Sequence, residues 1–229
     1  MSLIINIDTS NKIAQVILSD KDGVIDILAD SQAMEHASFL QPAIKRILEK
    51  NHIDFNDIKA VSVVNGPGSY TGLRIGLAGA KGICHVLGLP LIAHNTLDVI
   101  AHSLKNRIGP DFRGFICPMI DARRMEVFTA LYKAENLEKI SNVEAKVLDE
   151  NFIQEYLPFG SKIVFGGDGA GKFKASVENE NYQFANEGDL SVSIAKMSYE
   201  RLLHEQFDDL ILTEPFYSKA FYSTIKLNK

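Results

Sequence analysis

The order of predicted strands and helices occurs twice along this chain of 229 residues, and the repeat limits the fold more than any other feature of the sequence. Apolar runs of strand length and longer runs with helical spacing predict strand, strand, strand, helix, strand, helix, strand, helix in each half. In the first half the strands are expected at residues 3–7, 13–18, 24–28, 59–64 and 91–93, and the helices at 38–50, 71–87 and 95–106. In the second half the strands are expected at 115–120, 125–132, 137–147, 162–165 and 182–184, and the helices at 150–156, 172–177 and 191–205.

Short polar loops join the first three strands of each half, which is typical of an antiparallel meander. The later strands alternate with helices, so each half is expected to form one mixed sheet covered by helices. The sequence predicts an α/β protein of two duplicated lobes, residues 1–108 and residues 109–229, the second ending in an aromatic tail.

Residues at matching positions support the duplication. Ile7-Asp8 ends the first strand of one half, and Ile120-Asp121 ends the first strand of the other. The run Val63-Val64-Asn65-Gly66 is likewise matched by Val164-Phe165-Gly166-Gly167. We therefore expect two related lobes that face each other across a cleft.

Charge and composition exclude several classes of protein. The 24 Lys and Arg residues against 29 Asp and Glu residues give a formal charge of −5, which disfavours nucleic-acid binding by this chain alone. No apolar stretch approaches the length of a membrane span, and no secretory signal is expected at the start of the chain. Cys84 and Cys117 are expected to be buried thiols, so we predict a cytoplasmic protein without contact with a membrane.

Two aspartates are expected at the tips of the first hairpins, on opposite walls of the cleft. Asp8 and Asp121 there would hold Mg²⁺ through water or orient a nucleophile, while nearby turns bind phosphate through backbone N–H groups. The same two residues could instead only cap their turns. The candidate nucleotide-binding residues are Asp8, Thr9, Ser10, Asp121, Gly167, Asp168 and Gly169. Lys172 follows the second glycine turn, where it would contact phosphate or lie in solvent.

The helix expected at residues 71–87 carries an unusual stripe of glycines. Gly72, Gly76 and Gly79 recur on one face, and each costs up to about 1 kcal/mol relative to alanine inside a helix. Close approach of another backbone compensates this cost, and that neighbour is either the sheet beneath or a partner protein. Because the opposite face is apolar as well, we predict that the helix is covered on both sides. The candidate partner interface comprises Leu40, Ile44, Ile47, Leu73, Gly76, Gly79, Ala80 and Ile83.

The duplicated pattern resembles the actin-like ATPases, the ASKHA proteins with RNase H-like lobes. More specifically, residues 65–82 resemble the signature of the TsaB family, also called YeaZ. Ile7-Asp8-Thr9-Ser10, Ile120-Asp121-Ala122-Arg123 and Glu214-Pro215-Phe216-Tyr217 resemble three further motifs of that family.

The resemblance implies a non-catalytic subunit in the synthesis of threonylcarbamoyladenosine in tRNA. Proteins of this family bind a TsaD-like transferase through helices of the N-terminal lobe, recruit a TsaE-like ATPase, and pair with a second copy when TsaD is missing. The resemblance further implies that tRNA is contacted only indirectly. The resemblance implies no definite cofactor of this chain, and ATP or ADP would occupy the cleft or be supplied by the complex.

The TsaD-like relatives carry an HxxxH metal motif that this chain lacks. The comparable stretch has His36, but Leu40 stands at the position of the second histidine. One imidazole cannot make that metal site, so no metal site and no catalytic residue of this chain are expected. Two alternatives remain at this stage: a stand-alone ATPase or phosphotransferase that uses Asp8 and Asp121, and a glycoprotease-like metallopeptidase.

Overall fold

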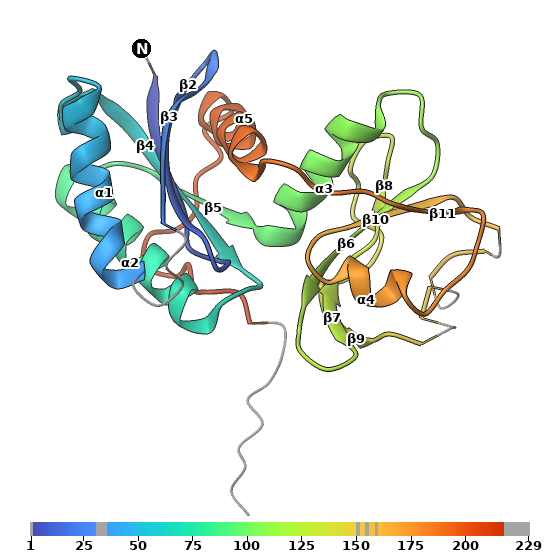
Figure 1. The fold of residues 1–229 in the computed structure, drawn as a ribbon. Coiled ribbons are helices and arrows are strands. Elements are labelled where there is room, and N and C mark those ends of the chain that lie inside the picture. Colours follow the sequence, from blue (N-terminus) through green and yellow to red (C-terminus); the bar gives the residue numbers. More distant parts are fainter. Residues whose placement is uncertain (1, 31–35, 150–151, 154–155, 159, 218–229) are drawn as a thin grey trace, which may run out of the picture.

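The computed structural model describes residues 2–30, 36–149, 152–153, 156–158 and 160–217, and it contains two mixed sheets with helices on their faces (Figure 1). The first sheet is formed by β1 (Leu3–Asp8), β2 (Ala14–Asp20), β3 (Gly23–Asp30), β4 (Ile58–Gly66) and β5 (Leu91–Asn95), in the order β3-β2-β1-β4-β5. The second contains β6 (Phe115–Asp121), β7 (Glu126–Thr129), β9 (Glu144–Val147), β10 (Ile163–Gly166) and β11 (Tyr182–Phe184), in the order β11-β10-β6-β7-β9. The short strand β8 (Tyr132–Lys133) pairs with β6.

The two sheets have the same construction, which confirms the predicted α/β fold of two duplicated lobes. In the first sheet β1 pairs antiparallel with β2 and parallel with β4. In the second sheet β6 pairs antiparallel with β7 and parallel with β10. The hairpins that follow β1 and β6 therefore occupy equivalent places in the two lobes.

The helices are α1 (His36–Lys50), α2 (Tyr70–Leu87), α3 (Thr96–Ile108), α4 (Ala170–Lys174) and α5 (Leu190–Leu203), with a 3₁₀ turn η1 (Phe55–Asp57). Local signals explain the bounds of α2. Its N-cap Ser69 accepts a hydrogen bond from the Gly72 N–H, and Gly88 ends the helix in a left-handed conformation with φ 65°. The helices α1 and α2 cover one face of the first sheet, where they share a core with β1 and β4.

Some strands of the second half differ from the prediction. The run expected as one strand at residues 125–132 is divided between β7 and β8. The strand expected at 137–147 begins only at Glu144, because Leu137 has a left-handed φ of 58° that no strand accommodates. The helix expected at 150–156 lies largely outside the described residues.

The helices α3 and α5 each pack on the sheet of the other half of the chain. Leu97, Ile100 and Leu104 of α3 share a core with Ile116 and Tyr132 of the second half. In return, α5 lies on the first sheet, as Figure 1 shows, and its Ile194 packs with residues of β2 and β4. This exchange positions the two lobes against each other.

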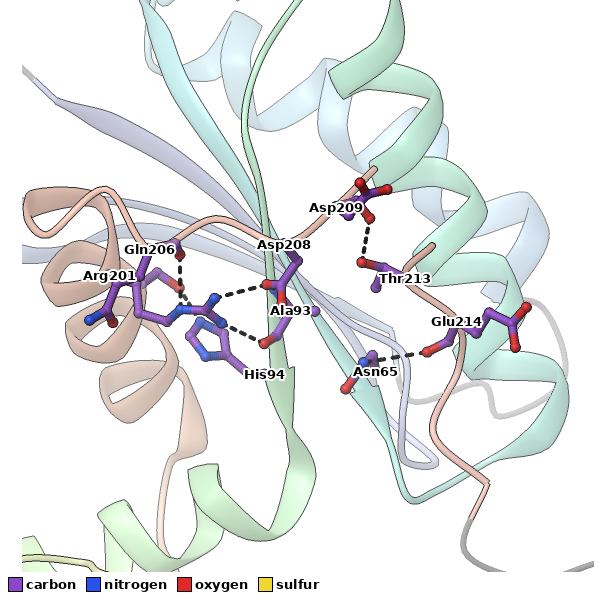
Figure 2. A network of polar contacts seen from close by, with 10 residues as sticks. Asn65, Ala93, His94, Arg201, Gln206, Asp208, Asp209, Thr213 and Glu214 are labelled. Carbon is purple, nitrogen blue, oxygen red and sulfur yellow. Dashed lines mark hydrogen bonds and ion pairs between the residues drawn. The ribbon is translucent and has the colours of Figure 1, made fainter. Parts of the chain in front are cut away.

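A strap formed by residues 206–217 runs from α5 back along the first lobe (Figure 2). Arg201 fixes its start: the guanidinium donates to the Asp208 carboxylate at 2.9 Å and to the Ala93 carbonyl at 2.7 Å. Farther along, the Phe216 N–H donates to the Asn65 carbonyl at 2.8 Å. The strap thus connects α5 with the first residues of β5 and with the carboxyl end of β4. No helix in the described part of the chain is both long and apolar enough to cross a membrane.

Candidate functional site

A cleft of about 330 Å³ opens between the two lobes. The β1–β2 hairpin forms one wall, α3 and the end of β6 contribute to the other, and the segment before α5 completes it. Its lining residues are Asp8, Asn11, Lys12, Ile13, Gln15, Ile100, Ile120, Asp168, Glu187, Gly188, Asp189 and Leu190. Of the candidate nucleotide-binding residues, only Asp8 and Asp168 line this cleft, and whether the set binds nucleotide stays a prediction.

Asp8 lies at the base of the cleft with 4% of its surface exposed. The Ser10 N–H and hydroxyl both donate to its Oδ1, at 2.9 Å and 2.7 Å. Burial raises the pKa of the Asp8 carboxyl above its ordinary value, although these hydrogen bonds and nearby His36 oppose the shift. Ser10 is therefore occupied in holding Asp8.

Thr9 is packed into α2 rather than into the cleft. Its Oγ1 donates to the Gly72 carbonyl at 2.7 Å, and a side chain at Gly72 or Gly76 would overlap Thr9. A Cβ at Gly79 would stand 2.8 Å from Leu40 of α1. The close neighbours of the glycine stripe therefore belong to the same chain. Of the two explanations that the sequence left open, the structure supports the intramolecular one.

Asp121 is exposed and forms an ion pair with Lys172. The hydrogen bond from Lys172 lowers the pKa of the Asp121 carboxyl. The Arg123 N–H also donates to Asp121 Oδ1, at 2.6 Å, and lowers this pKa further. Lys172 also donates to the Arg124 carbonyl at 2.6 Å. Lys172 is therefore paired with Asp121, an arrangement that sequence reasoning had not considered.

The turns of the second lobe have their own carboxylates bound to their backbone N–H groups. Asp168 accepts from the Asp121 N–H at 2.8 Å, and Glu187 accepts from the Gly167 N–H at 3.1 Å. Gly167 and Gly169 both pack against β6, where a side chain would meet Met119 and Ile120 respectively. A phosphate group at these turns would first have to displace the carboxylates. Sequence reasoning missed Glu187, because no local pattern relates it to a turn 20 residues earlier.

The histidine of the incomplete metal motif has a structural contact. His36 Nε2 lies 2.9 Å from the Asn11 carbonyl oxygen, and Leu40 is a core residue with 1% of its surface exposed. Among the described residues, no group of three or more His, Cys, Asp or Glu side chains is placed to hold a metal ion. Both cysteines are buried as expected, and burial raises the pKa of the Cys84 thiol to about 11 and of the Cys117 thiol to about 12.

Most residues of the candidate partner interface lie beneath the surface of α1 and α2. Gly76 and the side chains of Leu40, Ile44, Ile47, Leu73 and Ala80 are buried within the chain, and Gly79 and Ile83 are half-buried. They are buried because α1 and α2 pack on each other and on the first sheet. A partner docked on these helices would meet Ala78, Gly82 and Val86 of α2, which are exposed.

Comparison with known proteins gives one family match. A family model described as "TsaD: tRNA N6-adenosine threonylcarbamoyltransferase" matches residues 11–202. The tRNA threonylcarbamoyladenosine biosynthesis protein TsaB of Bacillus subtilis (strain 168) is 35% identical over 133 residues, which cover 58% of this chain and 56% of that protein. The chain thus spans about half the length of the curated relatives it matches. The resemblance to TsaB found in the sequence is confirmed.

Solved structures confirm the fold. The structure of YeaZ from Pseudomonas aeruginosa aligns with a TM-score of 0.76 at 20% identity and covers 95% of this chain and 100% of that chain. A polyphosphate/ATP-glucomannokinase from Arthrobacter sp. strain KM aligns with a TM-score of 0.52 at 9% identity, over 87% of this chain and 99% of that chain. The two-lobe architecture is therefore the one found in the actin-like sugar kinases.

Proposed function

We propose a function from the premise that the chain belongs to the TsaD family, whose model matches residues 11–202. In this proposal the chain is a subunit that binds and activates a TsaD-type transferase in the synthesis of threonylcarbamoyladenosine in tRNA. It performs no transfer by itself, and a TsaE-type ATPase supplies the hydrolysis of ATP. Without the transferase, two copies of the chain pair through the same surface, in the cytoplasm.

The observation that carries this proposal is the position of Leu40. The residue stands where the second histidine of an HxxxH motif would be, and it is packed against Gly79 inside the core of the first lobe. His36, the remaining imidazole, is in contact with the Asn11 carbonyl. The local structure is thus built around an apolar side chain at this position, which supports an activating role rather than metal-dependent transfer.

The exposed ridge of α2 is the surface that we assign to the partner. We define the ridge by Ala78, Gly82 and Val86, which follow each other at intervals of four residues and therefore share one face of the helix. Val86 is 79% exposed, and a Cβ at Gly82 would meet no atom within 4 Å. Small side chains on an exposed helix permit the close approach of a partner helix, and Val86 adds apolar area.

Gly82→Arg tests this surface without disturbing the fold. The arginine has open space in the free chain but stands in the way of a docked helix, so we expect binding of the transferase to weaken about 30-fold or more, a loss typical of an interface hot spot. Gly171→Arg on α4 is the matched control, because a Cβ there also meets nothing within 4 Å. Titration calorimetry with the purified transferase measures both variants. Equal affinity of the Gly82 variant and the control would refute the assignment.

The stand-alone ATPase is the second candidate, and the cleft with Asp8 at its base favours it. The bonds of Asp168 and Glu187 to backbone N–H groups weigh against it, because phosphate binding needs those donors. Turnover of ATP by the isolated chain, abolished by Asp8→Ala, would support this candidate over an activating subunit.

A further inference from the structure

The carboxylates that line the cleft between the lobes are left without ion pairs. They are Asp8, Asp168, Glu187 and Asp189. None of them forms a salt bridge within the part of the chain that the structure describes, and Lys12 is the one cation among the described lining residues. Negative charge therefore exceeds positive charge in the cleft.

The backbone holds each of these carboxylates through one oxygen only. The accepting oxygens are Asp8 Oδ1, Asp168 Oδ1, Glu187 Oε2 and Asp189 Oδ1, and the donors are the N–H groups of Ser10, Asp121, Gly167 and Ser191 in that order, at 2.8 to 3.1 Å. The second oxygen of each carboxylate accepts no hydrogen bond from the described residues. The backbone thus fixes the orientation of the four groups and leaves one acceptor on each for a ligand.

Asp8 has an environment that the fold alone does not explain. The residue is only 4% exposed, and a buried carboxylate oxygen without a partner is costly. The unpartnered side-chain atoms that the described residues seal from solvent are Thr96 Oγ1 and Ser191 Oγ, so Asp8 Oδ2 is reached from the cleft that Asp8 lines. An acceptor that is buried yet open to a cleft indicates a ligand with a positively charged donor.

The carboxylates are spread along the cleft and do not surround one point. Asp8 ends β1, Asp168 follows β10, and Glu187 and Asp189 precede α5. Among the described residues, no three His, Cys, Asp or Glu side chains are placed to hold one metal ion. The apolar residues that share the cleft with these carboxylates are Ile13, Ile100, Ile120 and Leu190. An extended cation with apolar segments between its charges matches this lining better than a compact divalent cation does.

We propose that the cleft binds a linear aliphatic polyamine. One ammonium group donates to Asp8 Oδ2 at the base, a second donates to Glu187 or Asp189, and the methylene chain between them packs on the apolar walls. The volume of about 330 Å³ falls within the range of small-molecule sites, about 300 to 1,000 Å³.

The same contacts disfavour a nucleotide and favour a polycation. Asp168 and Glu187 occupy backbone N–H groups that a phosphate would need, and their remaining oxygens are acceptors for ammonium groups. The inference goes beyond the proposed function and does not depend on it, because every lining residue belongs to this chain.

Titration calorimetry of the isolated full chain with spermidine tests the site, in about 50 mM NaCl so that salt screens little. We expect Asp8→Asn with Asp189→Asn to weaken binding at least about tenfold, because each change removes a charge but keeps an oxygen for the backbone N–H. Asparagine also caps a helix as well as aspartate does, so α5 keeps its N-cap. Glu178→Gln with Glu205→Gln is the control with the same change of charge, at exposed residues outside the cleft.

Two further ligands separate a shaped site from attraction to net charge. N-acetyl-lysine methylamide carries one ammonium group on a methylene chain, and we expect it to bind at least about tenfold more weakly than spermidine, because it meets one carboxylate only. Mg²⁺ carries its charge at one point, so Mg²⁺ at the concentration of spermidine should not displace it.

NMR of the wild-type chain labelled at isoleucine methyl groups gives the location of the ligand. The methyl signals of Ile100 and Ile120 should shift with spermidine and saturate with the calorimetric Kd. Ile211 is 84% exposed on the strap, outside the cleft, and its signal should not move.

Equal spermidine affinity of the double variant and its control, or displacement of spermidine by Mg²⁺, would show attraction to surface charge and overturn the site. Unchanged signals of Ile100 and Ile120 would overturn it as well, and this measurement needs no variant to fold. Tighter binding of the lysine analogue than of spermidine would assign the cleft to a lysine side chain of a protein and exclude the polyamine. Failure of the chain to bind the transferase would refute the proposed function and leave these measurements unchanged.

Discussion

At the scale of single residues, the contact of Thr9 with α2 explains the glycines of that helix. The Thr9 side chain enters the space that side chains at Gly72 and Gly76 would need, and its hydroxyl bonds the Gly72 carbonyl at 2.7 Å. Thr9 is fully buried, so neither partner of this contact can move toward solvent. The first hairpin and α2 are thereby fixed to each other next to Asp8.

Two glycine substitutions in α2 should have opposite effects on stability. Gly76→Ala forces its Cβ against Thr9 Oγ1, and we expect a loss of about 1 to 3 kcal/mol, as in other overpacked cores. Gly82→Ala meets open space, so it should gain about 0.5 to 1 kcal/mol from helix propensity alone. Urea denaturation measures both changes. Similar values for the two variants would show that Thr9 yields without cost.

At the scale of elements, polar contacts hold the strap against the first lobe. Arg201 makes three of them, with Ala93, Asp208 and the Gln206 carbonyl, the last at 3.1 Å (Figure 2). Lys81 of α2 adds a bond to the Ile211 carbonyl at 3.1 Å. Beyond these anchors the strap exposes Ile211 and Leu212, at 84% and 76%. Its docking therefore relies on polar anchors more than on burial.

Arg201→Ala should release the strap while the sheets stay folded. The change removes charge-assisted hydrogen bonds that are partly exposed, so we expect a loss of about 1.5 to 3 kcal/mol. Hydrogen exchange should show faster exchange of the Phe216 and Asp208 amides and unchanged exchange in β1. Arg46→Ala, at an exposed position of α1, is the control. Protected strap amides in the Arg201 variant would mean that other contacts hold the strap.

At the scale of the whole molecule, α5 joins the lobes through a face with buried polar groups. His94 of β5 is 2% exposed and lies 2.8 Å from the Ser198 hydroxyl of α5. His102 of α3 lies 3.1 Å from Ser193 of the same helix. Burial lowers the pKa of His94 from 6.5 to about 3, and Arg201 and His102 add to the shift. The contact between α5 and β5 thus favours the neutral form of the His94 imidazole.

Acid should therefore weaken the attachment of α5. Between pH 6.5 and about 3, His94 is protonated in the unfolded chain but stays neutral in the folded chain. The free energy of unfolding therefore falls as the pH drops through this range. His94 alone accounts for up to about 1.4 kcal/mol per pH unit in this window. His94→Gln keeps a donor for Ser198 without the titration, and its unfolding free energy should depend less on pH. Urea denaturation from pH 8 to pH 5 makes the comparison, and equal slopes would exclude His94 as the source.

Asp8 acts in the opposite direction, because burial raises the pKa of its carboxyl above the model-peptide value of 3.8. Its contribution to stability is present below that value and is lost as the pH rises through the folded pKa. The comparison of wild type with His94→Gln removes this contribution, since Asp8 is common to both.

The sequence alone determined most of the strands and helices, their duplicated order and the placement of Asp8 and Asp121 at equivalent hairpins. Those features follow from the local alternation of apolar residues and from turn residues, which act over a few positions. The missed division between β7 and β8 and the late start of β9 reflect backbone conformations, such as that of Leu137, that apolar patterning does not encode.

The tertiary structure decided what those elements meet. Thr9 fills the space beside α2, Glu187 accepts a hydrogen bond from the Gly167 N–H, and α5 packs on the first sheet. Each of these contacts joins residues far apart in the sequence, and Thr9 and Gly72 are separated by 63 positions. A glycine stripe or a buried leucine looks the same in sequence whether its neighbour is a partner or the same chain. The division of the chain near residue 108 likewise stays a prediction, because α3 and α5 each bury their apolar face on the sheet of the other half.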